Sequence, residues 1–193
     1  MAKQFVADYL DRLTQLLAAT DLEAVDRIAG LLWEAYLQDR VVFVIGNGGS
    51  AATASHMACD FAKGATVAGK RRLRVISLTD NVALMTAIGN DIGYEKLFTE
   101  QLAGLARPGD LLVAFTASGN SPSILDALRW ARARGVVTVG VLGFEGGAAA
   151  DLVEHRLIFC SRNYGLVEDA HLILEHSLSQ WLRGKIEAEG EPE

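Results

Sequence analysis

The stretch at residues 41–60, VVFVIGNGGSAATASHMACD, constrains the fold of this chain more than any other. It begins with β-branched and aromatic residues, which are typical of a strand buried on both faces of a parallel sheet. A glycine-rich turn, GNGGS, follows at residues 46–50, and the alanines after it favour a helix. The first turn of a helix leaves backbone N–H groups unpaired at the positive end of the helix dipole, where anions bind. The stretch therefore predicts a strand, a phosphate-binding turn and a helix.

Two other interpretations of this turn are open from the turn alone. A tight strand–helix turn can form without any ligand. The turn also fits the G-x-G-x-x-A pattern of dinucleotide-binding folds through Gly46, Gly48 and Ala51, with Asp80 as the acidic residue near the next strand. Asn47 and Ser50 favour a small polyhydroxy ligand instead, because their side chains hydrogen-bond hydroxyl groups.

The rest of the chain alternates helical and strand patterns. We expect further strands at 73–78, 111–115, 136–142 and 157–160, with helices at 82–88 and 94–106, from 121, and at 167–186. Such alternation predicts one α/β domain over residues 1–193, with a five-stranded parallel sheet between two helical layers, as in Rossmann-like folds. The acidic residues 187–193 are expected to form a loose tail.

Two amphipathic helices, at 2–19 and 22–38, precede the first strand. Together they carry more apolar surface than one small sheet must bury. Two outcomes stay open for the pair, residues 1–40: it covers the sheet of its own chain, or it packs on another subunit in an oligomer.

A second polar turn repeats the chemistry of the first. Residues 116–121, TASGNS, follow the expected strand at 111–115, and Pro122 stands where a helix accepts proline, at its first position. The carboxyl ends of parallel strands meet at one edge of the sheet, where ligands bind in such folds. We therefore expect both turns to face the same ligand, which disfavours a nucleotide cofactor.

Composition excludes several classes of protein. The net charge of −6 argues against a nucleic-acid-binding surface, which needs a basic patch. No apolar run is long enough to span a membrane, and the N-terminus does not resemble a signal peptide. The two cysteines, Cys59 and Cys160, are expected to be reduced thiols. A cytoplasmic location follows as the expectation.

GNGGS at 46–50, GND at 89–91, SGNS at 118–121 and a histidine-containing last helix together resemble the sugar isomerase (SIS) domain. More closely, and over almost the whole chain, they resemble the sedoheptulose 7-phosphate isomerase, or phosphoheptose isomerase, family. The resemblance implies a homotetramer whose active sites draw on more than one subunit. It also implies an aldose–ketose isomerase that makes D-glycero-D-manno-heptose 7-phosphate for surface polysaccharide. A non-catalytic relative that binds a phosphosugar or a replication-initiation protein, and an isomerase of another sugar phosphate, are the alternatives.

The resemblance also assigns residues to the substrate. In the family pattern the second turn holds the phosphate, while the first turn and the GND motif hold or line the sugar. The substrate-binding residues it implies are Asn47, Gly48, Gly49, Ser50, Asn90, Asp91, Thr116, Ala117, Ser118, Ser121 and Glu168. Ala117 stands where the family usually has a hydroxyl residue.

Isomerisation needs a base, an acid and a group that stabilises the developing oxyanion. His56 and Asp60 lie four residues apart, so they share a helix face, and this spacing also suits a metal pair. Glu168 and His176 lie on the last helix. By resemblance, Asp60, Glu168 and His176 are catalytic, and these three with His56 bind a zinc ion.

Two of these positions depart from the family pattern. Asp60 replaces a longer glutamate, and Glu168 replaces a glutamine, which adds a charge that would strengthen a metal site or supply a replacement base. His171 and Glu175 share the polar side of the last helix with them, as supporting groups or simple hydrogen-bonding residues, and Asp169 is a rival carboxylate.

Overall fold

Five parallel strands form one sheet in the order β2-β1-β3-β4-β5 in the computed structural model, which describes residues 1–189. The strands are β1 (Val41–Ile45), β2 (Arg74–Ser77), β3 (Leu111–Thr116), β4 (Val137–Gly143) and β5 (His155–Phe159). The predicted five-stranded parallel sheet is confirmed. Because β1 lies between β2 and β3, the chain leaves β1 toward one side and later returns to its other side at β3. The carboxyl ends of β1 and β3 thus flank the switch point of the topology.

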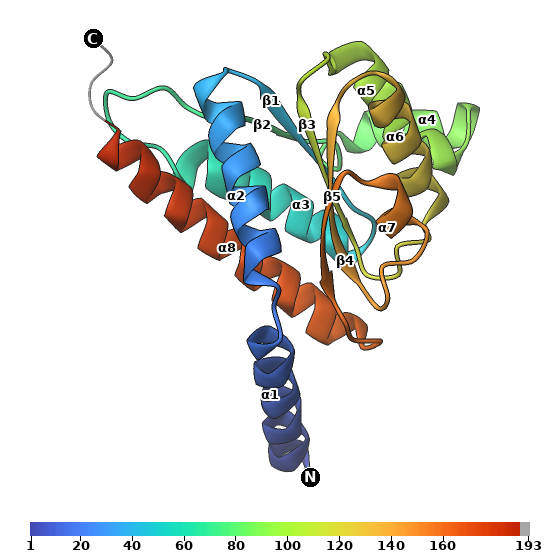
Figure 1. Ribbon diagram of the computed structural model, residues 1–193. Coiled ribbons are helices and arrows are strands. Elements are labelled where there is room, and N and C mark those ends of the chain that lie inside the picture. Colours follow the sequence, from blue (N-terminus) through green and yellow to red (C-terminus); the bar gives the residue numbers. More distant parts are fainter. Residues whose placement is uncertain (190–193) are drawn as a thin grey trace.

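Helices cover both faces of this sheet (Figure 1). One face carries α2 (Leu22–Leu37), α3 (Gly49–Cys59), which continues as the π-helical turn η1 (Asp60–Gly64), and α8 (Tyr164–Ala188). The other carries α4 (Val82–Asp91), the 3₁₀ turn η2 (Tyr94–Lys96), α5 (Thr99–Leu105), α6 (Pro122–Ala133) and α7 (Ala149–Leu152).

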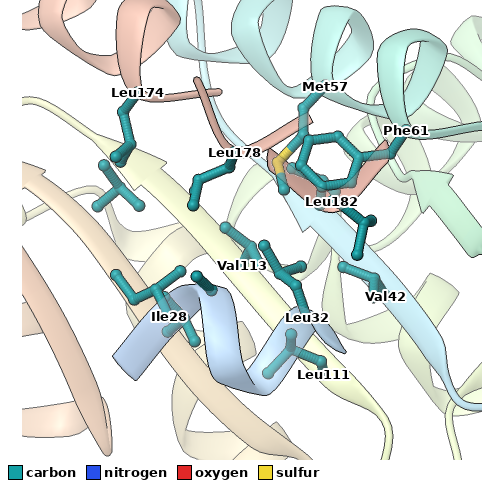
Figure 2. Close-up of a cluster of buried hydrophobic side chains, with 14 of the residues drawn as sticks. Ile28, Leu32, Val42, Met57, Phe61, Leu111, Val113, Leu174, Leu178 and Leu182 are labelled. Atoms are coloured by element: carbon teal, nitrogen blue, oxygen red, sulfur yellow. The ribbon is translucent and has the colours of Figure 1, made fainter. Parts of the chain in front are cut away.

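The period of two along β1 explains how one strand serves two cores. Val42 and Val44 point toward α2, α3 and α8, whereas Val41, Phe43 and Ile45 point toward the opposite helical layer. Figure 2 shows the first of these cores, in which Ile28 and Leu32 of α2 face Met57 of α3 and three leucines of α8, Leu174, Leu178 and Leu182. This packing places α3 and α8 side by side over the sheet.

The first helix, α1 (Ala2–Ala18), extends away from the other elements (Figure 1). None of its residues is buried, and Phe5, Val6 and Leu10 are exposed. The Tyr9 hydroxyl donates a hydrogen bond of 2.6 Å to Asp169 Oδ2 and so joins α1 to α8. Of the two helices that precede the sheet, α2 therefore covers it. α1 packs only Leu16 and Leu17 of its last turn against the core and leaves Phe5, Val6 and Leu10 exposed.

Several boundaries differ from the sequence expectation; α4 continues to Asp91 and α8 begins at Tyr164, where helices were predicted at 82–88 and 167–186. The helix predicted at 94–106 is interrupted at Leu97 and Phe98, which lie between η2 and α5 and are buried in the core. The tail expected at 187–193 begins later than predicted, since Glu187 and Ala188 still belong to α8, and residues 190–193 lie outside the described part of the chain. None of the helices formed by residues 1–189 is long and apolar enough to cross a membrane.

Candidate active site

A cavity of about 290 Å³ opens at the carboxyl ends of β1 and β3. Both polar turns line it, as the sequence predicts, and α8 closes one side with Tyr164 and Glu168. The predicted ligand-binding residues that it brings together are Asn47, Gly48, Gly49, Ser50, Thr116, Ala117, Ser118, Ser121 and Glu168. Asn90 and Asp91 do not line this cavity; they end α4, where the Asn90 side-chain amide donates to Asp91 Oδ1 at 2.7 Å.

Side-chain hydrogen bonds fix the first turn. The Asn47 amide donates to Ser123 Oγ at 2.9 Å, and its oxygen accepts a bond of 3.1 Å from the Tyr94 hydroxyl. One N–H of the amide is left to meet a ligand. Gly48 turns the chain into α3 with a φ of 56°. Residues other than glycine rarely adopt this backbone conformation.

The second turn is fixed by its own backbone and by the loop before α7. Gly119 N–H donates to Thr116 Oγ1 at 3.2 Å, and Asn120 bridges the Ser118 carbonyl, at 3.0 Å, to the Ala148 N–H, also at 3.0 Å. Gly119 has a φ of 65°, and any Cβ there would collide with the Gly146 carbonyl. These contacts hold the turn in place before any ligand arrives.

Helix N-termini make the cavity attractive to an anion. The first residues of α3 (Gly49 and Ser50), the N-cap residue Ser121 of α6 and the first residue of α8, Tyr164, all line it. The Ser121 side chain makes no capping hydrogen bond, so its hydroxyl is available to a ligand. Three positive helix ends and several hydroxyl groups suit a phosphate group.

Glu168 enters the cavity from α8 and lies directly against Gly49. A Cβ on residue 49 would overlap the Glu168 carboxylate, so the glycine provides the room that this side chain occupies. The carboxylate therefore sits beside the first turn, on the side where the sugar is expected.

A second group of polar side chains lies further along the same two helices. His56 of α3, Asp60 of η1, and Glu175 and His176 of α8 each offer a ligand atom, and these atoms all lie within 4.8 Å of one another. The His56 and His176 Nε2 atoms are 3.1 Å apart, His56 Nε2 lies 3.6 Å from Asp60 Oδ2, and His176 Nε2 lies 3.5 Å from Glu175 Oε2. His56 and Asp60 thus lie on the same helix face, as predicted, and Asp60 is the residue at which the π-helical turn begins.

The buried members of this part of α8 have shifted pKa values. Burial, together with the negative charge of Asp60, raises the pKa of Glu175 to about 7. Burial also lowers the pKa of His171, which packs between Phe115 and Phe159, to about 4. The backbone carbonyl of Leu142 partly offsets this lowering of the His171 pKa, although neither ring nitrogen of His171 meets hydrogen-bond geometry with it.

Two residues of the site were not assigned to it from the sequence. Tyr164 follows the predicted motifs without belonging to one, and Glu175 was expected only as a supporting or hydrogen-bonding residue. Glu175 belongs to the group that can hold a metal ion, whereas Glu168 lies outside that group, in the cavity. The signals in the sequence for Glu175 are its place on the polar side of the last helix and its position next to His176.

The sheet order and the cavity define the class of the protein, a parallel α/β domain with a cavity between two polar turns at the switch point of its sheet. Residues 4–143 match the family model described as the SIS domain. The chain is 36% identical over 182 residues to the phosphoheptose isomerase of Nitratidesulfovibrio vulgaris, which covers 93% of this chain and 87% of that protein.

Solved structures agree with the sequence match. The phosphoheptose isomerase structure from Neisseria gonorrhoeae has a TM-score of 0.87 at 27% identity, and it covers 95% of this chain and 100% of that one. The phosphoheptose isomerase structure from Francisella tularensis has a TM-score of 0.89 at 26% identity, with coverage of 95% and 99%. The chain belongs to the phosphoheptose isomerase family of SIS-domain proteins.

Proposed function

We propose that this protein is the aldose–ketose isomerase that converts sedoheptulose 7-phosphate into D-glycero-D-manno-heptose 7-phosphate in heptose biosynthesis. The family membership supports this activity, since its curated relatives are phosphoheptose isomerases. The observation that carries the proposal is the cavity, which gathers both predicted turns and lies on the same two helices as His56 and His176.

The phosphate end of the substrate belongs at the second turn. The hydroxyls of Thr116, Ser118 and Ser121 face the cavity together with the N-terminus of α6, so they donate to phosphate oxygens. Ala117 contributes only its backbone, which reduces the number of hydroxyl donors by one compared with the usual family pattern.

The length of the substrate suits the spacing along the helices. Six residues of α3 separate Ser50 from His56, a rise of about 9 Å, and eight residues of α8 separate Glu168 from His176, a rise of about 12 Å. An extended seven-carbon phosphosugar spans on the order of 10 Å from phosphorus to C1, at about 1.2 Å per bond. A sugar whose phosphate is bound in the cavity that Ser50 and Glu168 line is therefore long enough to bring its carbonyl end toward the histidines.

Asp60, Glu168 and His176 are the residues that we assign to proton transfer. A carboxylate removes a proton from the carbon beside the carbonyl, which gives an enediol, and the proton returns at the neighbouring carbon. His176, half exposed and near Asp60 and His56, is the acid that supplies the proton to the sugar oxygen while its Nε2 carries a proton, a role that it cannot fill at the same time as binding an ion through that atom. Glu168 faces the sugar side of the cavity, and it acts as the base in place of Asp60 if the shorter Asp60 side chain does not reach the sugar carbon.

A zinc ion is the cofactor that we propose, held by His56, Asp60 and His176. Imidazole nitrogens and a carboxylate are the donors that zinc prefers, and their spacings of 3.1 and 3.6 Å fit neighbouring ligands of one ion. When bound, the ion would polarise the oxygens of the sugar. The family pattern assigns Glu168 as a further ligand.

We propose a homotetramer in which α1 packs on another subunit and residues Asn90 and Asp91 reach a neighbouring active site. The exposed apolar side chains of α1, and the position of these two residues away from the cavity of their own chain, support this arrangement. We place the enzyme in the cytoplasm, because the charged phosphate prevents its substrate from crossing a lipid bilayer.

The test is to incubate the purified protein with sedoheptulose 7-phosphate and to follow the anomeric proton signals by NMR. Appearance of D-glycero-D-manno-heptose 7-phosphate supports the proposal. Absence of product, while sedoheptulose 7-phosphate still raises the melting temperature, refutes the isomerase and points to a phosphosugar-binding protein. Ribulose and fructose phosphates, added in parallel, show whether another sugar phosphate is preferred.

A further inference from the structure

Glu175 is a buried carboxylate that the assigned chemistry does not use. The residue is 1% exposed, and neither of its side-chain oxygens has a hydrogen-bond partner among residues 1–189. The charged form of a buried carboxylate is strongly destabilising unless an opposite charge or a metal ion compensates for it, and without such a partner the group takes up a proton. The position of Glu175 therefore suits a cation that compensates for its charged form.

The groups around Glu175 are metal-binding in type. His176, its neighbour on α8, brings Nε2 to 3.5 Å from Glu175 Oε2, and this is the ion-pair contact that the described residues give Glu175. His56 and Asp60 approach from α3 and η1, and all four ligand atoms lie within 4.8 Å of one another. Asp60 carries the same charge as Glu175, so the pair adds repulsion that a cation would relieve.

The spacing of these atoms matches a single ion. Ligand atoms about 2.1 Å from a tetrahedral zinc ion lie about 3.4 Å from one another. The three measured neighbour distances are 3.1 Å (His56 to His176), 3.6 Å (His56 to Asp60) and 3.5 Å (His176 to Glu175). An ion between the four side chains needs only small adjustments of their ends.

Glu168 is placed differently. It lies two helical turns before His176, about 12 Å along α8. Its carboxylate fills the space that Gly49 leaves beside the sugar cavity. It is therefore free to act on the sugar.

We propose that Glu175, and not Glu168, is the second carboxylate ligand of the ion, so that the metal site of this chain consists of His56, Asp60, Glu175 and His176. This inference rests on the proposed function, since it deepens the account of the same active site. Its test measures metal binding and not turnover, so that the two can fail separately.

The experiment compares Glu175→Gln with Glu168→Gln. Both substitutions replace a carboxylate on α8 with an amide of nearly the same shape, so each is the control for the other. The full-length proteins are stripped with a chelator and titrated with Zn²⁺ against a chromophoric competitor. We expect zinc affinity to fall at least about 10-fold in Glu175→Gln and to stay within about 3-fold of the wild type in Glu168→Gln.

A spectroscopic readout checks direct ligation. Co²⁺ bound in place of Zn²⁺ has visible absorption bands that depend on the number and type of its ligands. These bands should change in Glu175→Gln and remain as in the wild type in Glu168→Gln. The reverse pattern of affinities or spectra, equal losses in both variants, or a wild-type protein that binds neither metal overturns the proposal.

Folding of the variant is checked by circular dichroism before the titration. If Glu175→Gln does not fold, Glu175→Asp takes its place, because it keeps the charge and shortens the reach by one methylene group. Zinc affinity unchanged in Glu175→Asp, within about 3-fold, then counts against the assignment, and a loss of about 10-fold or more supports it. Zinc binding of the expected pattern in a protein without isomerase activity would leave this inference standing and refute the proposed function alone.

Discussion

Replacing His171 with glutamine removes a titratable group from the core and should flatten the acid dependence of stability. The side chain is fully buried between Phe115 and Phe159, and burial lowers its pKa from 6.5 to about 4. Above pH 6.5 the imidazole is neutral in both the folded and the unfolded chain, and its contribution to stability is fully present. As the pH falls, the unfolded chain gains a proton that the folded chain does not accept until about pH 4, and stability is lost.

The magnitude follows from these two pKa values. Between pH 7 and pH 5 the wild type should lose about 2 kcal/mol of unfolding free energy through His171, and the glutamine variant should not. Glu175 acts in the opposite direction, because its pKa is raised from 4.5 to about 7, so its contribution is lost as the pH rises through this range. Both proteins contain Glu175, and its effect therefore cancels in the comparison.

Urea unfolding followed by circular dichroism at pH 7, 6 and 5 measures this difference. Both proteins are measured without metal and at the same protein concentration, because metal binding and self-association also change the apparent stability. If the glutamine side chain has a cost that does not depend on pH, it lowers the unfolding free energy of the variant equally at every pH and leaves the pH dependence unchanged. Parallel pH dependences for the two proteins would refute the reasoning, because they would mean that the folded protein accepts a proton at His171 as readily as the unfolded chain does.

Three further predictions concern the site. Ser118→Ala should weaken sugar-phosphate binding about 10-fold in calorimetry, because it removes a hydroxyl donor from the phosphate turn. His176→Asn should reduce turnover at least about 100-fold with an unchanged circular dichroism spectrum; full activity would exclude His176 as the acid. Gly49→Ala should reduce turnover by about 100-fold with little loss of stability, because its methyl group displaces the flexible Glu168 carboxylate. Gly30→Ala on α2, where a Cβ meets nothing within 4 Å, is the matched control and should keep wild-type activity.

Much of the fold could be predicted because the relevant signals are local. Apolar runs and turn residues along the chain predict each strand and the two polar turns, and the parallel alternation predicts that the turns share one edge of the sheet. The cavity between β1 and β3 confirms that prediction. The spacing of His56 and Asp60 likewise predicts their shared face, since four residues make about one helical turn.

The composition of the polar group on α3 and α8 could not be predicted in the same way. On α8 alone, Glu175 and His176 project about 100° apart, whereas Glu168 and His176 are about 80° apart around the axis, so helical spacing favours Glu168. Distance along the axis and the packing of α3 against α8 reverse that preference. The packing of the two helices brings His56 and Asp60 close to Glu175 and His176. It leaves the Glu168 carboxylate next to Gly49, in the space that a larger residue would fill.

The sequence by itself thus determined which segments are strands and helices, where the anion-binding turns fall, and which residue types are present for the chemistry. Only the tertiary structure decided which carboxylate faces the histidines and which faces the sugar cavity. The reason is physical: periodicity describes one element at a time, whereas the neighbours of a side chain depend on how two elements far apart in the chain pack together.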